Sequence, residues 1–235
     1  MKIITREQWG ALEPESITPL FAYNISGIAV HYSAAYADEL GDPYQRVRAI
    51  QKYHMGPGHD PTMPWSDIAY NFLFSRDGLI FEGRGWNKRS AAQGTKNGND
   101  HFIAICFLGT DKDNRDDVTS QGRVALSDFI NYAMWAQFKK PLEVQPHNFF
   151  HSTECPGDEL RSYIQAKGWK HENKLGLPSW YWTWVQWRLG ENKFKGYGKR
   201  NKNVKPTSIP KKIPYNVWVA YNKFLLNRKK IRINV

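Results

Sequence analysis

The stretch Ser26-Gly27-Ile28-Ala29-Val30-His31 places an apolar run directly before a histidine. A short apolar run that contains β-branched residues is typical of a strand whose two faces are both buried. Such strands lie inside a sheet that helices cover. We therefore predict a central strand that ends at His31.

Outward from this strand, helix and strand patterns alternate. Asp42 followed by Pro43 indicates a helix start, because aspartate caps free amide groups and proline fits the first helical turn. Arg76-Asp77-Gly78 predicts the turn of a hairpin. We predict helices over residues 43–54, from 119 onward and over 158–166, strands over 26–31, 68–74, 79–81 and 101–108, and loops over 83–99 and 147–155. The expected fold is a mixed α/β domain over residues 1–170, with a central mixed sheet and helices packed on it.

The apolar stripes of two of these helices follow from the helical repeat. In the helix over residues 43–54, Val47, Ile50 and Tyr53 recur on one face and are expected to face the core. In the helix that follows Thr119, the predicted stripe extends to Trp135.

The composition excludes several classes of protein. Hydrophobic residues make up 41% and charged residues 23% of the chain, as in folded globular proteins. The sequence lacks a run of about 18 apolar residues, so it implies no transmembrane helix. Two cysteines, Cys106 and Cys155, are too few for a disulfide framework. Residues 1–7 lack the apolar core of a secretory signal, so we expect synthesis in a cytoplasm.

The C-terminal region differs in charge and composition from the rest. From Ala166 onward the chain has 17 Lys and Arg against two Asp and Glu. We expect a small, mainly helical, basic module over residues 171–235, rich in tryptophan at 180–187. These tryptophans suit either a stacking surface for sugar rings or the core of the module itself. The charge favours a polyanionic partner, such as an anionic wall polymer, a membrane surface or a nucleic acid.

Three residues suggest a catalytic metal site. His31 ends a strand, and His147 and Cys155 flank a loop. Imidazole and thiolate both suit Zn²⁺, and catalytic zinc sites use three protein ligands with one open position. His151 lies nearer to Cys155 than His147 does, so spacing alone leaves the choice of histidine open.

Six segments in order resemble the N-acetylmuramoyl-L-alanine amidase family, which includes phage amidase-type lysozymes and peptidoglycan recognition proteins. Residues 6–11 resemble the Arg-x-x-Trp-Gly-Ala opening of the recognition proteins. The other matching segments are residues 28–33, 65–72, 76–86, 103–109 and 147–156. The resemblance covers about Arg6 to Leu160, and it implies the family's fold, a mixed sheet with helices and a zinc groove.

The resemblance also implies roles for individual residues. It makes His147 rather than His151 the zinc ligand, beside His31 and Cys155. It implies that Tyr70 and Thr153 act at the open metal position. The substrate-binding residues that it implies are Trp65, Arg84, Trp86 and His151. The chain departs from relatives at Tyr32 and Asn71, where histidines are common, and it lacks a histidine within residues 90–94.

The function that follows is zinc-dependent hydrolysis of the bond between N-acetylmuramic acid and L-alanine in bacterial peptidoglycan. We expect a phage endolysin, made in the host cytoplasm and acting at the cell wall after release. The basic module would then contact anionic wall polymers or a membrane surface, and no nucleic acid is expected. The alternatives are a protein that binds peptidoglycan without cutting it, and a regulator that acts through the basic tail.

Overall fold

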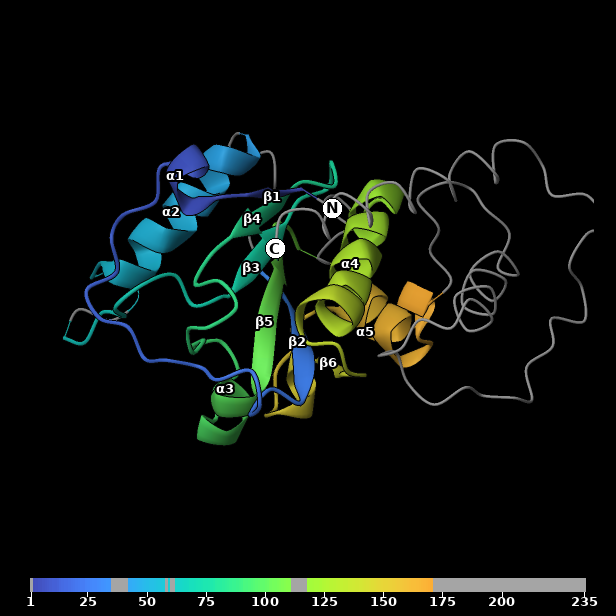
Figure 1. The fold of residues 1–235 in the computed structure, drawn as a ribbon. Helices are drawn as coiled ribbons and strands as arrows, with labels where there is room; N and C mark the ends of the chain where they lie inside the picture. Colours follow the sequence, from blue (N-terminus) through green and yellow to red (C-terminus); the bar gives the residue numbers. More distant parts are fainter. Residues whose placement is uncertain (1, 35–41, 58, 60–61, 111–117, 171–235) are drawn as a thin grey trace, which may run out of the picture. The chain divides into compact units, whose positions relative to one another are not determined.

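The computed structural model describes residues 2–34, 42–57, 59, 62–110 and 118–170, which form a sheet between helices (Figure 1). The basic module expected over residues 171–235 lies outside the described residues. The strands are β1 (Ile3–Ile4), β2 (Gly27–Tyr32), β3 (Phe72–Phe74), β4 (Ile80–Glu82), β5 (Phe102–Phe107) and β6 (Glu143–Pro146). The helices are α1 (Arg6–Trp9), α2 (Pro43–Met55), α3 (Lys96–His101), α4 (Ser120–Tyr132) and α5 (Asp158–Gln165), with short turns η1 (Ala133–Gln137), η2 (His147–Phe149) and η3 (Gly168–Lys170).

The sheet is mixed, as the sequence predicted. Its strand order within the described residues is β1-β4-β3-β5-β2-β6. The hairpin strands β3 and β4 are antiparallel, and all other neighbours are parallel. Every residue of β2 and β5 is buried, which agrees with the apolar runs that predicted them. Strand β2 lies between β5 and β6; His31 pairs with Cys106 of β5, and the pairing with β6 ends one residue earlier, at Val30.

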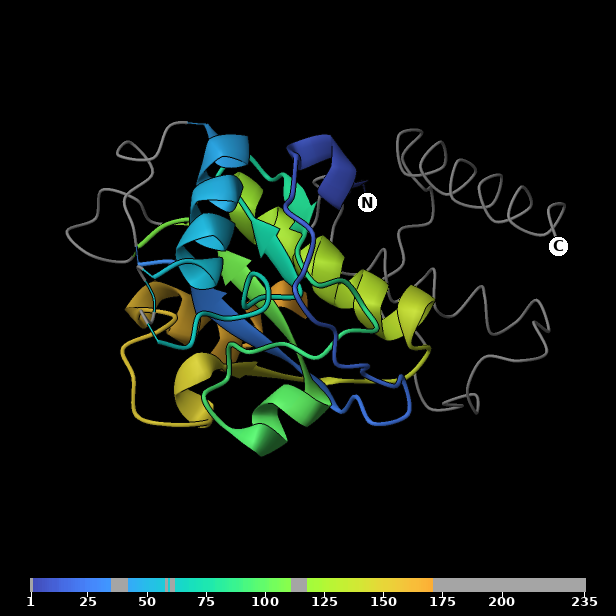
Figure 2. The same cartoon turned by 90° about the vertical axis from the view of Figure 1, so that its left-hand side faces the viewer.

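Helices cover both faces of the sheet (Figures 1 and 2). On one face α1 and α2 lie over a core that contains Trp9, Val47 and Leu73. On the other face α4 and α5 cover a larger core that includes Phe72 and Phe129. None of the helices in the described residues is long and apolar enough to span a bilayer.

Helix α2 begins as predicted, but its buried face differs from the prediction. The Asp42 side chain accepts a hydrogen bond from the Gln45 amide, and Pro43 occupies the first turn. Tyr53, which was expected in the core, is 54% exposed. Val47 is buried as predicted, and the helix also buries Gln51 and His54, which hydrogen-bond to the Asp67 side chain and the Ala69 amide.

Two further predictions are corrected, and two strands were missed. Helix α3 interrupts the loop that was predicted over residues 83–99, and the Thr95 side chain caps it. Trp135 is 50% exposed because the backbone widens into the π-helical turn η1, which takes this residue off the helical stripe. Strands β1 and β6 were not predicted; both are short strands at the edges of the sheet.

Candidate metal centre

The parallel pairing of β2 with β6 brings two distant histidines together. Val30 of β2 is in register with Pro146, the last residue of β6, so His31 and His147, the residues that follow these two, emerge at the same edge of the sheet. The centroids of their rings are 4.2 Å apart. Cys155 reaches the same place from the loop before α5, with its Sγ 3.9 Å from His31 Nδ1. The Sγ also accepts a hydrogen bond from the Tyr32 amide at 3.3 Å.

The ligand triad (His31, His147 and Cys155) fits a zinc ion. The ligand atoms of the three residues all lie within 4.8 Å of one another. His31 Nε2 and His147 Nδ1 are buried and lack a hydrogen-bond partner in the described residues. Buried polar atoms are nearly always paired, so two unpaired ring nitrogens at one point indicate a missing partner. Two imidazoles and a thiol are a donor set that zinc uses in catalytic sites.

The pKa values of the triad indicate neutral side chains in the metal-free protein. Burial lowers the pKa of His31 well below its usual value, and nearby His147 and His151 lower it further. Burial and His151 lower the pKa of His147 to about 4. Burial raises the pKa of the Cys155 thiol to about 12. Neutral imidazoles are ready to bind a metal, whereas the thiol needs a cation beside it to ionise.

The triad lies in a pocket of about 530 Å³. Its walls include three residues that the sequence singled out, Trp65, Tyr70 and Thr153. The Tyr70 ring lies 5.5 Å from that of His31, and burial and the neighbouring Cys106 raise the Tyr70 pKa well above its usual value. Tyr70 therefore keeps its proton at neutral pH. The Thr153 hydroxyl accepts from the Cys155 amide, which leaves its own proton to donate.

His54 also lines this pocket, and sequence reasoning did not select it. It is 8% exposed, and its Nδ1 accepts a hydrogen bond from the Ala69 amide at 3.2 Å. Because Nδ1 is an acceptor, the proton of the neutral ring is on Nε2. Burial and the nearby His59 lower the His54 pKa to about 4. The signal that could have found it is a histidine at a core-facing position of an amphipathic helix.

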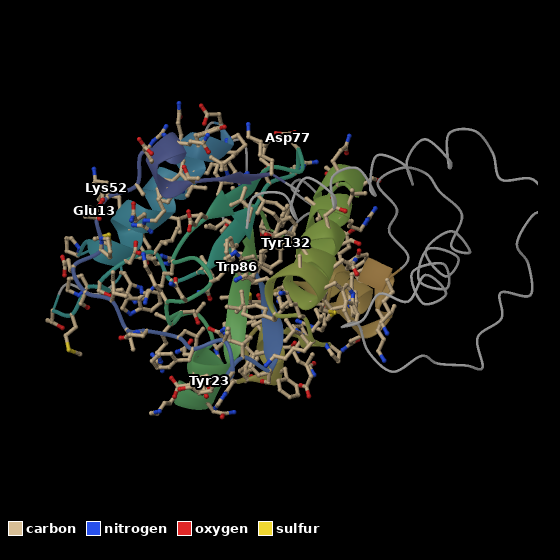
Figure 3. The ribbon with its side chains drawn as sticks, in the orientation of Figure 1. Glu13, Tyr23, Lys52, Asp77, Trp86 and Tyr132 are labelled. Carbon is tan, nitrogen blue, oxygen red and sulfur yellow. The ribbon has the colours of Figure 1, made fainter. Side chains whose placement is uncertain are left out.

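Two of the residues expected to bind substrate lie elsewhere. Arg84 is outside the described lining of the pocket, and it donates hydrogen bonds to the carbonyls of Asp67, Ile68 and Arg89. Trp86 is also outside that lining; it stacks on Phe129 of α4 and lies beside Tyr132 (Figure 3). Their contacts are those of residues that hold the fold.

His151 is beside the triad. Its Nε2 is 2.9 Å from Nε2 of His147, and the two rings are edge to face with centroids 4.6 Å apart. It is exposed at the surface rather than buried with the ligands.

Comparison with known proteins agrees with this fold and site. Residues 22–158 match the family model described as N-acetylmuramoyl-L-alanine amidase. The chain is 32% identical to peptidoglycan-recognition protein SC2 of Drosophila melanogaster over 170 residues. The aligned region covers 72% of this chain and 88% of the fly protein. Peptidoglycan recognition protein 1 of Mus musculus is 30% identical, and the alignment again covers 72% of this chain and 88% of the relative.

Solved structures of peptidoglycan recognition proteins share the fold of this chain. The crystal structure of the Drosophila peptidoglycan recognition protein SD superposes with a TM-score of 0.61 at 25% identity, covering 70% of this chain and 94% of that one. Peptidoglycan recognition protein LE, solved with tracheal cytotoxin, a monomeric diaminopimelic acid-type peptidoglycan, gives 0.60 at 27% identity, covering 70% and 92%. The family match spans more than half of the chain and includes His31, His147 and Cys155. The chain therefore belongs to the N-acetylmuramoyl-L-alanine amidase family.

Proposed function

We propose that this protein is a zinc-dependent amidase that hydrolyses the bond between N-acetylmuramic acid and L-alanine in bacterial peptidoglycan. The observation that carries the proposal is the convergence of His31, His147 and Cys155, with two buried ring nitrogens that have no hydrogen-bond partner among the described residues. The family match and the relative solved with a peptidoglycan fragment support the choice of substrate.

The triad would hold the zinc ion, and the pocket would hold the scissile amide beside it. Zinc supplies Lewis acidity toward the carbonyl and acidifies water, which addresses the poor reactivity of amides near neutral pH. The wall formed by Trp65 and His54, whose ring centroids are 4.9 Å apart, would exclude water from one side of the substrate.

Tyr70 and Thr153 are the groups that we propose to act on the reacting atoms. Tyr70 is protonated at neutral pH, so it can donate a hydrogen bond to the oxyanion that develops as the amide is attacked. Thr153 holds its hydroxyl oxygen toward the Cys155 amide and can donate its proton into the pocket. The Nε2–H of His54 is a third hydrogen-bond donor that lines this pocket. Such donors stabilise the transition state most when they are fixed in place before the reaction.

The experiment uses the full chain and purified sacculi, and mass spectrometry measures stem peptides freed from the glycan. We expect release by the zinc-loaded protein, loss of release in a strong chelator, and recovery when zinc is added back. Cys155→Ser, which removes a ligand of the triad, serves as the control for metal dependence. Undiminished release in the chelator would refute the metal mechanism.

The main alternative is a protein that binds peptidoglycan without cutting it. Recognition proteins solved in complex with tracheal cytotoxin make binding a second candidate function. The same experiment separates the two functions, because a binder sediments with sacculi and frees no stem peptide.

We propose further that the reaction takes place at the bacterial cell wall, and that the basic residues after Ala166 contact anionic wall polymers there. Sedimentation with sacculi before and after removal of these polymers tests the second point. The relatives reported above are animal recognition proteins, so they lend no support to a phage endolysin. That expectation rests on the sequence alone, and lysis of cells with permeabilised membranes is its test.

A further inference from the structure

His151 makes a contact with the triad that the amidase mechanism does not use. Its Nε2 is 2.9 Å from His147 Nε2, while its Nδ1 is 3.1 Å from the carbonyl oxygen of Ser152. A carbonyl oxygen can only accept, so the Nδ1 of His151 carries a proton. In a neutral ring the Nε2 of His151 is then an acceptor, and the proton between the two histidines belongs to His147 Nε2.

This hydrogen-bond arrangement determines which nitrogen of His147 is available to a metal. With its proton on Nε2, His147 presents a lone pair on Nδ1, and Nδ1 is the buried atom that lacks a partner in the described residues. The main-chain carbonyl of Gln93 also hydrogen-bonds to the His147 ring.

The position of the His151 ring is itself held by the backbone. Gly94 has a φ of +68°, and a Cβ at this residue would lie 2.6 Å from Cδ2 and 2.7 Å from Nε2 of His151. Glycine thus leaves the space that the ring occupies.

We propose that His151 is a positioning residue for the metal site: by accepting the Nε2 proton of His147 it fixes the tautomer and ring orientation that present Nδ1 to zinc. Partners of this kind typically contribute 10–100-fold, as an order of magnitude, to metal affinity. We expect a loss of about tenfold, at the lower end of this range. The inference rests on the proposed zinc site but not on hydrolysis of peptidoglycan.

The test measures zinc affinity of the full chain by competition with a chromophoric chelator. His151→Leu, which removes the acceptor, should weaken zinc binding about tenfold. His151→Gln, whose Oε1 can accept the same proton, should stay close to the parent. Gly94→Ala should resemble His151→Leu, because the added Cβ occupies the space of the ring. The matched control is His101→Leu. His101 directly precedes β5, whereas Cys106, the β5 residue that pairs with His31, lies at the other end of this strand.

A second measurement does not depend on metal or activity. Long-range ¹H–¹⁵N spectra of the metal-free protein report which nitrogen of each imidazole is protonated, and we expect Nε2–H on His147 and Nδ1–H on His151. A proton on His147 Nδ1 would overturn the proposal. Unchanged zinc affinity in His151→Leu would overturn it as well, and so would equal losses in the Leu and Gln variants, which indicate packing alone. A protein that binds zinc in this pattern but frees no stem peptide would disprove the amidase and leave this inference intact.

Discussion

The buried His54 should make the fold sensitive to acid. In the folded protein its pKa is lowered to about 4, whereas an exposed histidine in the unfolded chain has a pKa of about 6.5. The folded pKa is the lower one, so the stabilising effect is present above about pH 6.5 and is lost as the pH falls toward about 4. The unfolded chain binds the extra proton in that window.

The magnitude follows from the size of this pKa difference. Between about pH 7.5 and about pH 4.5, linkage gives a loss of about 2–3 kcal/mol in the free energy of unfolding from this one group. His54→Asn is the matched variant, because its side-chain oxygen can accept the Ala69 amide proton without titrating. Other groups, including His31 and His147, titrate in both proteins, so their effects cancel in the comparison.

The assay is urea unfolding of both proteins at the two pH values, with a chelator present to keep metal out. We expect the parent to lose about 2–3 kcal/mol more than His54→Asn on acidification. Equal losses would refute the reasoning, because they would show that His54 is charged or solvated in the folded protein and that this wall of the pocket is open to water.

Three further predictions concern the metal, the reaction and the fold. Elemental analysis should find stoichiometric zinc in the parent and little in Cys155→Ser, because the substitution removes one of three ligands; zinc retained by the variant would contradict the site. Tyr70→Phe should lower kcat for stem-peptide release by about 10²–10³-fold with little change in KM, as expected for the loss of a transition-state donor, and an unchanged kcat would remove Tyr70 from the mechanism. Arg6→Leu should lower the free energy of unfolding by about 3–5 kcal/mol in urea titrations, because it leaves the buried Asp67 carboxylate without its 2.9 Å partner. A loss below about 1 kcal/mol would show that this pair behaves as a surface ion pair.

Much of the fold was readable from the sequence because its central elements follow simple patterns. The apolar run before His31 predicted β2, and Asp42 with Pro43 fixed the start of α2. The prediction failed at the edges of the sheet. Strand β6 has the sequence Glu-Val-Gln-Pro, which carries little apolar signal, and only its pairing with β2 makes it a strand.

The same failure explains why the residues alone could not settle the metal site. His147 is brought to His31 by the register of β6 on β2, which no spacing along the chain reveals. The choice between His147 and His151 therefore needed the family resemblance. In the structure the two histidines are neighbours, with 2.9 Å between their Nε2 atoms, so both candidates lie at the metal site.

The residues that identified the family include some that never reach the pocket, and their contacts explain why the site needs them. Asp67 lies in the segment that carries Trp65 and Tyr70, and its carboxylate accepts from Arg6, from the Gln51 amide at 2.7 Å and from the Ile68 amide. Arg84 donates to the carbonyls at the same place. A buried carboxylate tolerates few arrangements, because each lost partner leaves a desolvated charge. This network fixes the backbone beneath Tyr70, and so an arginine near the start of the chain helps to set where the proposed proton donor stands relative to the triad.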